Sequence, residues 1–298
     1  MSSNTTSEPR PNLAERAHLP VVVVAGASGY IGQALVKRLR PRFRVVGLSR
    51  RRHGPCRQGL VDEWRRCDLY SLKDATDGLA GADYVVYLVH SMLPQDRLTQ
   101  GRFADLDILL ADNFARAARA ACAKQIIYLG GIVPDYPNLS EHLSSRREVE
   151  DVLRGAQMPL TILRAGLIVG ADGSSSQILG RLVRRLPVMV CPPWTRSQTQ
   201  PVVLEDVIDL LTWATAQPRA FGQTFDLAGD EVMTYLDLIR KTARALGKPA
   251  RLINFPVGTP FMSALWVRMV TGAPLSLLRP LIESLRHDMT AGDHRIWS

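Results

Sequence analysis

The chain has 298 residues, of which 46% are hydrophobic and 22% are charged. This composition is typical of a globular protein and excludes the fibrous and disordered classes. The net charge of +9 comes mostly from arginines that are spread along the whole chain. Because no basic helix, finger or aromatic RNA-binding motif accompanies that charge, we expect no nucleic-acid partner.

The four cysteines are scattered and form no Cys-x-x-Cys pair, which favours a reducing, cytoplasmic setting. His53, Cys56 and Cys67 are too loosely spaced to predict a metal site, so no metal is expected. Residues 1–18 are polar and are expected to be a disordered tail. No run of 18 uncharged apolar residues occurs, so a membrane-spanning helix is not expected either.

From residue 19 the chain alternates between two kinds of segment. Residues 19–26 form a short β-branched run, and a glycine turn then leads into a helical pattern that Pro41 stops. Further strands are predicted at 43–49, 63–69, 82–90, 124–131 and 159–170, and helices near 72–80 and 100–122. This alternation predicts an α/β fold with a Rossmann-type, doubly wound parallel sheet over residues 19–170.

Beyond residue 170 the rhythm changes, and residues 171–298 are interpreted as a smaller, substrate-binding lobe at the carboxyl edge of the sheet. A strand turning into a helix is predicted at 198–217, and a second such unit at 223–247. In the second unit, Thr234 and Asp237 resemble a capping box, and Gly247 stands where a helix would end.

The segment 256–285 combines many large apolar residues with a few arginines. Three interpretations stay open: it packs on the small lobe, it lines a lipophilic substrate pocket, or it lies on an anionic membrane surface as a peripheral contact.

The glycine turn is the strongest functional signal. Glycines at 26, 29 and 32 allow a tight turn between a buried strand and a helix, and the free N–H groups of the helix start can meet a pyrophosphate. We therefore predict a dinucleotide site. Its contacts are expected from the residues of this turn: Gly26, Ser28, Gly29, Tyr30, Ile31 and Gly32.

The end of the second predicted strand reads Ser49, Arg50, Arg51 where an NAD-specific site would carry a carboxylate. A guanidinium there pairs with the 2′-phosphate of NADP, so NADP(H) is favoured over NAD(H). A solvated basic loop is the alternative.

His142, Arg146, Val149 and Leu153 share one helical stripe, and the apolar pair must pack on the sheet. We therefore expect His142 and Arg146 to face inward. An imidazole can exchange a proton near neutral pH, whereas a guanidinium can anchor ribose or phosphate but cannot shuttle protons. Either this pair is catalytic, or both residues only hold the cofactor.

Two further residues lie at the ends of predicted strands. His90 follows the fourth strand, so it contacts the nicotinamide or makes a structural hydrogen bond. Arg164 ends the sixth strand, so it meets a substrate anion or pairs with a neighbouring acid.

With these motifs together, the chain resembles an atypical, extended member of the short-chain dehydrogenase/reductase superfamily from about residue 19 to about 290. The matching pieces are the glycine turn, "CDL" (67–69), "LRAGLIVG" (163–170) and "PVVLEDV" (201–207). "YLVHSM", "YLGG", "SEHLSSR" and "LPVMVCPPW" are similar to a bacterial branch labelled nucleoside-diphosphate-sugar epimerase. NmrA-like redox sensors and the NAD(P)H-binding accessory subunit of complex I are more distantly similar.

The resemblance implies that Asp68 contacts the adenine ring, and we expect Leu69 and Val89 beside it at the cofactor. Substrate contacts are expected from Gly131, Arg164, Trp194 and Arg196.

The chain departs from the superfamily at the catalytic positions. Active members carry a Ser after the fifth strand and a Tyr-x-x-x-Lys motif on the next helix, but this chain has Gly130-Gly131, His142 and Arg146. Sugar epimerase or dehydratase chemistry is therefore not expected. The prediction is an NAD(P)H-dependent oxidoreductase that acts on a lipophilic carbonyl or quinone. The alternative is a non-catalytic NADP(H)-binding sensor or assembly protein.

Overall fold

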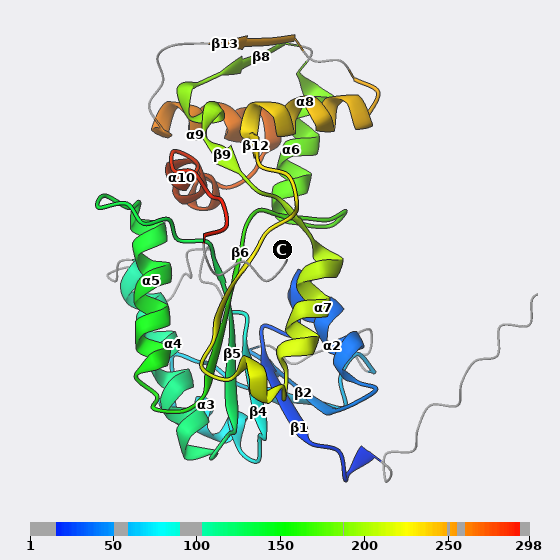
Figure 1. Ribbon diagram of the computed structural model, residues 1–298, viewed down its shortest axis with the longest axis vertical. Coiled ribbons are helices and arrows are strands. Elements are labelled where there is room, and N and C mark those ends of the chain that lie inside the picture. The colour runs from blue at the N-terminus through cyan, green and yellow to red at the C-terminus, as the bar shows by residue number, and fades with distance from the viewer. Residues whose placement is uncertain are drawn as a thin grey trace, which may run out of the picture.

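The computed structural model describes residues 16–50, 59–89, 103–186, 188–248, 251–254 and 260–292. Residues 1–15 of the predicted tail, Arg51, His90 and two of the loosely spaced metal candidates, His53 and Cys56, lie outside these residues. The predicted disordered tail of residues 1–18 extends too far, because Arg16 is buried and ion-paired with Asp62. Within them the chain forms one large parallel sheet with helices on both faces and a smaller lobe at one end (Figure 1).

The large sheet has seven strands in the order β11-β6-β5-β4-β1-β2-β3, and every pair is parallel. Chain order and spatial order diverge at β1, which lies between β2 and β4. This confirms the predicted doubly wound sheet, and the reversal at β1 is where such sheets bind ligands. The strands are β1 (Val21–Ala25), β2 (Arg44–Ser49), β3 (Glu63–Arg66), β4 (Tyr84–Tyr87), β5 (Gln125–Gly131), β6 (Leu160–Ala165) and β11 (Thr224–Leu227).

Both faces of the sheet are covered, which explains the unbroken valine run of β1. Val23 packs in the core beneath α3, α4 and α5, whereas Val22 and Val24 pack in the core beneath α2 and α7. The alternating side chains of one strand thus enter two different cores. The covering helices are α2 (Tyr30–Leu39), α3 (Leu72–Leu79), α4 (Phe103–Ala120), α5 (Glu141–Arg154) and α7 (Leu204–Ala214).

The small lobe forms around two apolar clusters of its own. The predicted capping box of Thr234 and Asp237 opens α8, and Gly247 follows that helix with a φ of +63°. Its helices are α6 (Ser174–Arg185), α8 (Tyr235–Ala245), α9 (Pro260–Thr271) and α10 (Leu275–Ser284), with a 3-10 turn, η2, at Pro193–Arg196. Its short strands pair as β8 (Val188–Cys191) with β13 (Arg251–Asn254) and β9 (Gln198–Thr199) with β12 (Met233–Thr234).

The two parts are not separated by a single boundary at residue 170. β7 (Ile168–Val169) pairs with β10 (Val202–Val203), and the chain then returns to the large domain, where α7 packs on α2 and β11 joins the sheet after the 3-10 turn η3 (Pro218–Ala220). The predicted division into 19–170 and 171–298 is therefore too simple, because α7 and β11 complete the Rossmann layer.

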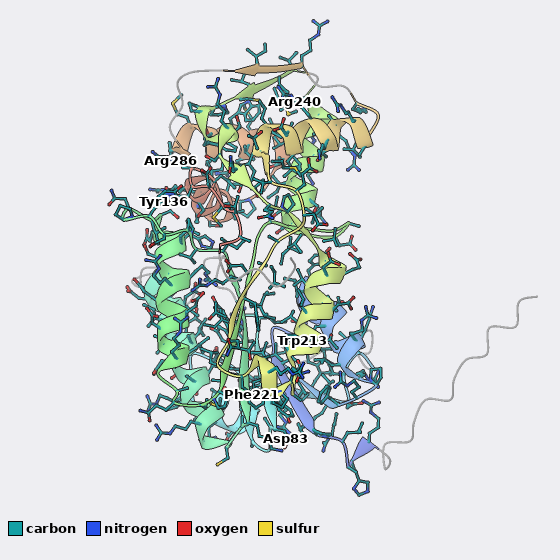
Figure 2. All side chains as sticks on the ribbon, viewed as in Figure 1. Asp83, Tyr136, Trp213, Phe221, Arg240 and Arg286 are labelled. Carbon is teal, nitrogen blue, oxygen red and sulfur yellow. The ribbon has the colours of Figure 1, made fainter. Side chains whose placement is uncertain are left out.

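The junction between the two parts is closed by contacts that the last described residues help to make. Ser140 at the start of α5 lies 3.0 Å from Ser284 of α10, and Tyr136 stacks on His287 at 5.7 Å between ring centroids. Figure 2 shows Tyr136 close to Arg286 at this junction. Further along, the Gly292 N–H donates to Asp226 of β11.

No helix in the described part of the chain is long and apolar enough to cross a bilayer.

Candidate active site at the carboxyl edge of the sheet

The glycine turn has the geometry that close approach to a pyrophosphate requires. Gly26 has a φ of +90°, a conformation that side chains disfavour, and a Cβ on Gly32 would lie only 2.1 Å from the Gly26 carbonyl oxygen. Gly29 caps α2 without a side-chain hydrogen bond, and the first turn holds no acid. The free N–H groups of this helix start therefore fit a bound phosphate group.

Other predicted cofactor residues gather along the same edge because they follow parallel strands that end there. Ser49 and Arg50 end β2, Asp68 and Leu69 follow β3, and Val89 follows β4. Arg50 is exposed.

The loop after β3 is held by two hydrogen bonds. The Tyr70 N–H donates to the Asp68 carboxylate at 3.3 Å, and the Asn113 side chain of α4 donates to the Leu69 carbonyl at 2.8 Å. These bonds fix the position of Asp68 at the sheet edge.

Tyr30 differs from its neighbours in the turn because its side chain leaves the cofactor edge. A Cβ on Gly170 would lie 2.0 Å from the Tyr30 hydroxyl, and the Tyr30 ring also lies against Gly173. Burial raises the pKa of Tyr30, the carboxylates of Asp172 and Glu205 add to the shift, and the nearby backbone of Asp172 and Gly173 opposes it. The Tyr30 side chain thus joins the glycine turn to the loop before α6.

The stripe on α5 faces inward as predicted. Arg146, Val149 and Leu153 are buried, and His142 is half-buried at the first turn. The Ser140 hydroxyl caps the helix by accepting the Leu143 N–H at 3.3 Å.

Arg146 is engaged with the protein itself. One guanidinium nitrogen is ion-paired and hydrogen-bonded with Asp107 of α4, and the other donates to the Tyr128 hydroxyl at 3.4 Å. Asp107 and Arg146 are both about 95% buried or more. A buried charge that is paired in this way is not available as a mobile anchor for phosphate or ribose.

Tyr128 fills the space at one of the two glycines that stand where the superfamily has its serine. Its ring, buried in β5, would lie 2.8 Å from a Cβ on Gly130, whereas a Cβ on Gly131 would meet only the Ala165 carbonyl oxygen, at 3.9 Å. Burial raises the pKa of Tyr128, and the positive charge of Arg146 opposes this shift. The phenol is therefore neutral over the physiological range.

A second buried ion pair lies one turn further along α5. Both carboxylate oxygens of Glu150, which is fully buried, accept from the guanidinium of Arg164 on β6, at 2.8 and 2.6 Å. Of the two interpretations of Arg164, the structure shows the pairing with an acid. This pair fastens α5 to the sheet.

Trp194 and Arg196, the other predicted substrate contacts, belong to the small lobe. The Trp194 indole donates to Ser263 of α9 at 3.2 Å and packs edge-on against Tyr235, while Arg196 is exposed. Gly131 and Arg164, in contrast, lie on the adjacent strands β5 and β6 of the large sheet.

Sequence reasoning missed Tyr128, Asp107 and Glu150. Asp107 could have been found, since it lies on the apolar stripe of α4 that runs through Leu110 and Phe114, and a carboxylate there requires a buried partner. Among the described residues, no group of three or more side chains is arranged to hold a metal ion.

Comparison with known proteins indicates the family of the chain. The model of the NAD dependent epimerase/dehydratase family matches residues 22–228. Ceramide reductase of Caulobacter vibrioides is 31% identical over 249 residues, which are 79% of this chain and 74% of that protein. The auxiliary protein GraX of Staphylococcus aureus is 27% identical over 112 residues, 38% of this chain, and the match spans only 36% of that protein.

Solved structures share the fold at low identity. A nucleoside-diphosphate-sugar epimerase from Staphylococcus aureus superposes with a TM-score of 0.71 at 15% identity, covering 91% of this chain and 92% of that one. An NADPH-dependent quinone oxidoreductase from Escherichia coli, complexed with NADPH, gives 0.69 at 19% identity, covering 89% and 88%. With the glycine turn, the sheet order and the family match in agreement, the chain belongs to the NAD-dependent epimerase/dehydratase family.

Proposed function

We propose that the protein is an NADPH-dependent reductase that acts on a lipophilic substrate bearing a ketone or quinone. The bound nicotinamide supplies a hydride, which adds to the carbonyl carbon of a ketone or to the quinone ring, and a proton completes the alcohol or quinol. The glycine turn, Ser49, Arg50 and Asp68 would hold the cofactor. Arg50, with Arg51 beyond the described residues, supports the choice of NADP(H) over NAD(H).

The observation that carries the proposal is the set of replacements around Gly130. The Tyr128 ring excludes a side chain at Gly130, and α5 carries His142 and an ion-paired Arg146 where relatives have Tyr and Lys. Oxidation of a sugar alcohol requires a strong base to remove its proton. Reduction of a carbonyl requires only a proton donor, which an imidazole supplies near neutral pH.

His142 is the proposed donor. It lies one helical turn before Arg146 on the inward stripe and is half-buried. Arg146 is better described as a positioning residue, since it ties α5 to α4 and to Tyr128.

The similarity to ceramide reductase supports a lipid as the substrate. The structural likeness to an NADPH-dependent quinone oxidoreductase supports a quinone as the second candidate substrate. We favour the lipid ketone, because the sequence match is the stronger of the two and covers most of both chains.

The test follows NADPH consumption with three substrates: a short-chain ceramide whose secondary alcohol is replaced by a ketone, a short-chain ubiquinone, and a water-soluble ketone. NADPH deuterated at the transferable position should place deuterium on the carbinol carbon of the lipid product. His142→Ala should lower kcat by roughly 10² to 10⁴. His142→Gln should retain NADPH binding.

A non-catalytic NADP(H)-binding role is the second candidate, because the ion pair of Arg146 with Asp107 removes the cation that the superfamily uses at the ribose. It would be correct, and the reductase proposal wrong, if NADPH bound normally while every substrate left its oxidation at the background rate.

A further inference from the structure

The small lobe carries an apolar face that its own core does not use. Phe261, Leu265 and Met269 lie at i, i+4 and i+8 on α9 and are between 50% and 77% exposed, and Met262 beside them is exposed as well. The opposite side of the helix, through Ala264 and Val267, is buried against α10. A helix that is apolar all round is normally buried on all sides, so α9 presents a surface suited to an apolar partner.

A second exposed apolar surface lies on the same lobe. Val188, Val190 and Ile253 point outward from the β8–β13 pair, while Met189 between them packs inward. Figure 1 shows this pair at the end of the molecule farthest from the large sheet.

The segments that carry these two surfaces contain basic residues and no acids. Between residues 238 and 282 the chain has no Asp or Glu and seven basic residues: Arg240, Lys241, Arg244, Lys248, Arg251, Arg268 and Arg279. Between residues 173 and 204 it again has no acid and has four arginines, at 181, 184, 185 and 196. Because these two segments lack acids, each carries a net positive charge on the lobe that exposes the apolar face.

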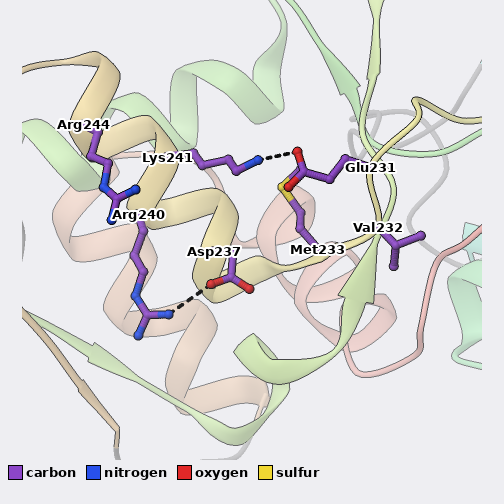
Figure 3. A pocket seen from close by; sticks show the side chains of 7 residues that line it. All are labelled: Glu231, Val232, Met233, Asp237, Arg240, Lys241 and Arg244. Carbon is purple, nitrogen blue, oxygen red and sulfur yellow. Dashed lines mark hydrogen bonds and ion pairs between the residues drawn. The ribbon is translucent and has the colours of Figure 1, made fainter.

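Some of these cations are neutralised inside the lobe and others are not. In the hollow beside α8, Arg240 pairs with Asp237 and Lys241 with Glu231 (Figure 3). Arg251 on β13 and Arg268 on α9 are exposed and form no ion pair with any other residue that the structure describes. Arg268 lies next to Met269, at the edge of the exposed apolar arc.

We propose that α9 is a membrane-docking surface that inserts Phe261, Leu265 and Met269 into the interface of an anionic bilayer, with Arg268 binding a lipid phosphate. An exposed apolar arc with a basic residue at its edge and no acid on its helix is the pattern that binds such a surface. The docking rests on the surface described here. Its purpose, delivery of a lipid substrate to the small lobe, rests on the proposed function.

The experiment is sedimentation of the full chain with vesicles of phosphatidylcholine alone and of phosphatidylcholine mixed with phosphatidylglycerol. The wild type should sediment with the mixed vesicles and remain in solution with the neutral ones. Leu265→Glu should weaken binding at least tenfold, and Arg268→Gln about fivefold. Leu109→Glu on α4 and Arg219→Gln, both at exposed sites in the large domain, are the matched controls and should bind as the wild type does.

Three results would overturn the proposal: a wild type that stays in solution with both vesicles, a Leu265→Glu variant that sediments normally, or a lipid-free dimer that Leu265→Glu dissociates, which would make the face a contact between copies. Unchanged NADPH binding by each variant shows that it is folded. Because sedimentation needs no turnover, loss of docking and loss of reductase activity are separate outcomes.

Discussion

The ring of Tyr128 occupies the space that a side chain at Gly130 would need. Two residues apart on β5, they point to the same face of the sheet, so the phenol that accepts a hydrogen bond from Arg146 also limits what can stand at Gly130. A side chain at Gly130 would require the Tyr128 ring to move.

Gly130→Ser should therefore destabilise the protein by about 1–3 kcal/mol, the range for overpacking a filled core. Gly131→Ser, where the space is open, should change the free energy of unfolding by less than about 0.5 kcal/mol. Urea unfolding followed by circular dichroism measures both. Equal effects of the two substitutions would contradict the steric explanation.

Replacing Arg146 with methionine leaves the Asp107 carboxylate buried without its cation, which should cost about 3–5 kcal/mol. Adding Asp107→Leu should recover most of that loss, because no uncompensated charge then stays in the core. Arg147→Met, at the next and exposed position of α5, is the control and should be nearly neutral. Unfolding free energies of the three variants and the wild type test this, and an Arg146→Met variant as stable as Arg147→Met would show that the ion pair does not contribute to stability.

Gly32→Ala should weaken dinucleotide binding, because its Cβ would press on the Gly26 carbonyl and displace the turn. We expect the NADPH affinity to fall by at least about tenfold, equivalent to about 1.4 kcal/mol, as measured by quenching of protein fluorescence. Gly180→Ala on α6, where the new methyl group has room, should bind normally. Normal binding by Gly32→Ala would mean that the cofactor does not approach this turn.

Arg50→Ala should weaken NADPH binding by about tenfold and leave NADH binding unchanged, since the proposed contact is a charged pair with the 2′-phosphate. Titration of the wild type and the variant with both nucleotides gives the comparison. Equal loss for both nucleotides would assign Arg50 to some other part of the cofactor.

The thiols should differ in reactivity with pH. Burial raises the pKa of Cys67 to about 12 and also raises the pKa of Cys191. Cys122, in contrast, is exposed. Iodoacetamide at pH ~8.5 should therefore label the accessible thiol of Cys122 in the folded protein, while Cys67 stays protonated and unlabelled. Peptide mass spectrometry checks this. In urea both should react, and labelling of Cys67 without denaturant would indicate local opening.

The sequence predicted those parts of the fold that depend on local pattern. The valine run of β1, the helix that Pro41 ends, the long helix after residue 100 and the capping box of Thr234 all form where periodicity and capping place them. The inward direction of Arg146 also followed from helical spacing alone.

The sequence alone did not predict which distant segments contact one another. That Asp107 meets Arg146, that Glu150 meets Arg164, and that β11 returns to the sheet beside β6 all depend on long-range contacts that no local pattern encodes. For this reason the sequence suggested the same two roles for His142 and Arg146, although Arg146 is already ion-paired with Asp107.

Tyr30 gives the cofactor turn and the small lobe a shared residue, with its backbone in the first and its hydroxyl held by the second. A movement of the lobe that draws the loop at 170–173 away would break this contact and free the start of α2. Nucleotide affinity and lobe position would then be coupled, and each would change the other by the same free energy. A lobe held in place by a lipid surface would consequently alter the affinity of the nucleotide site.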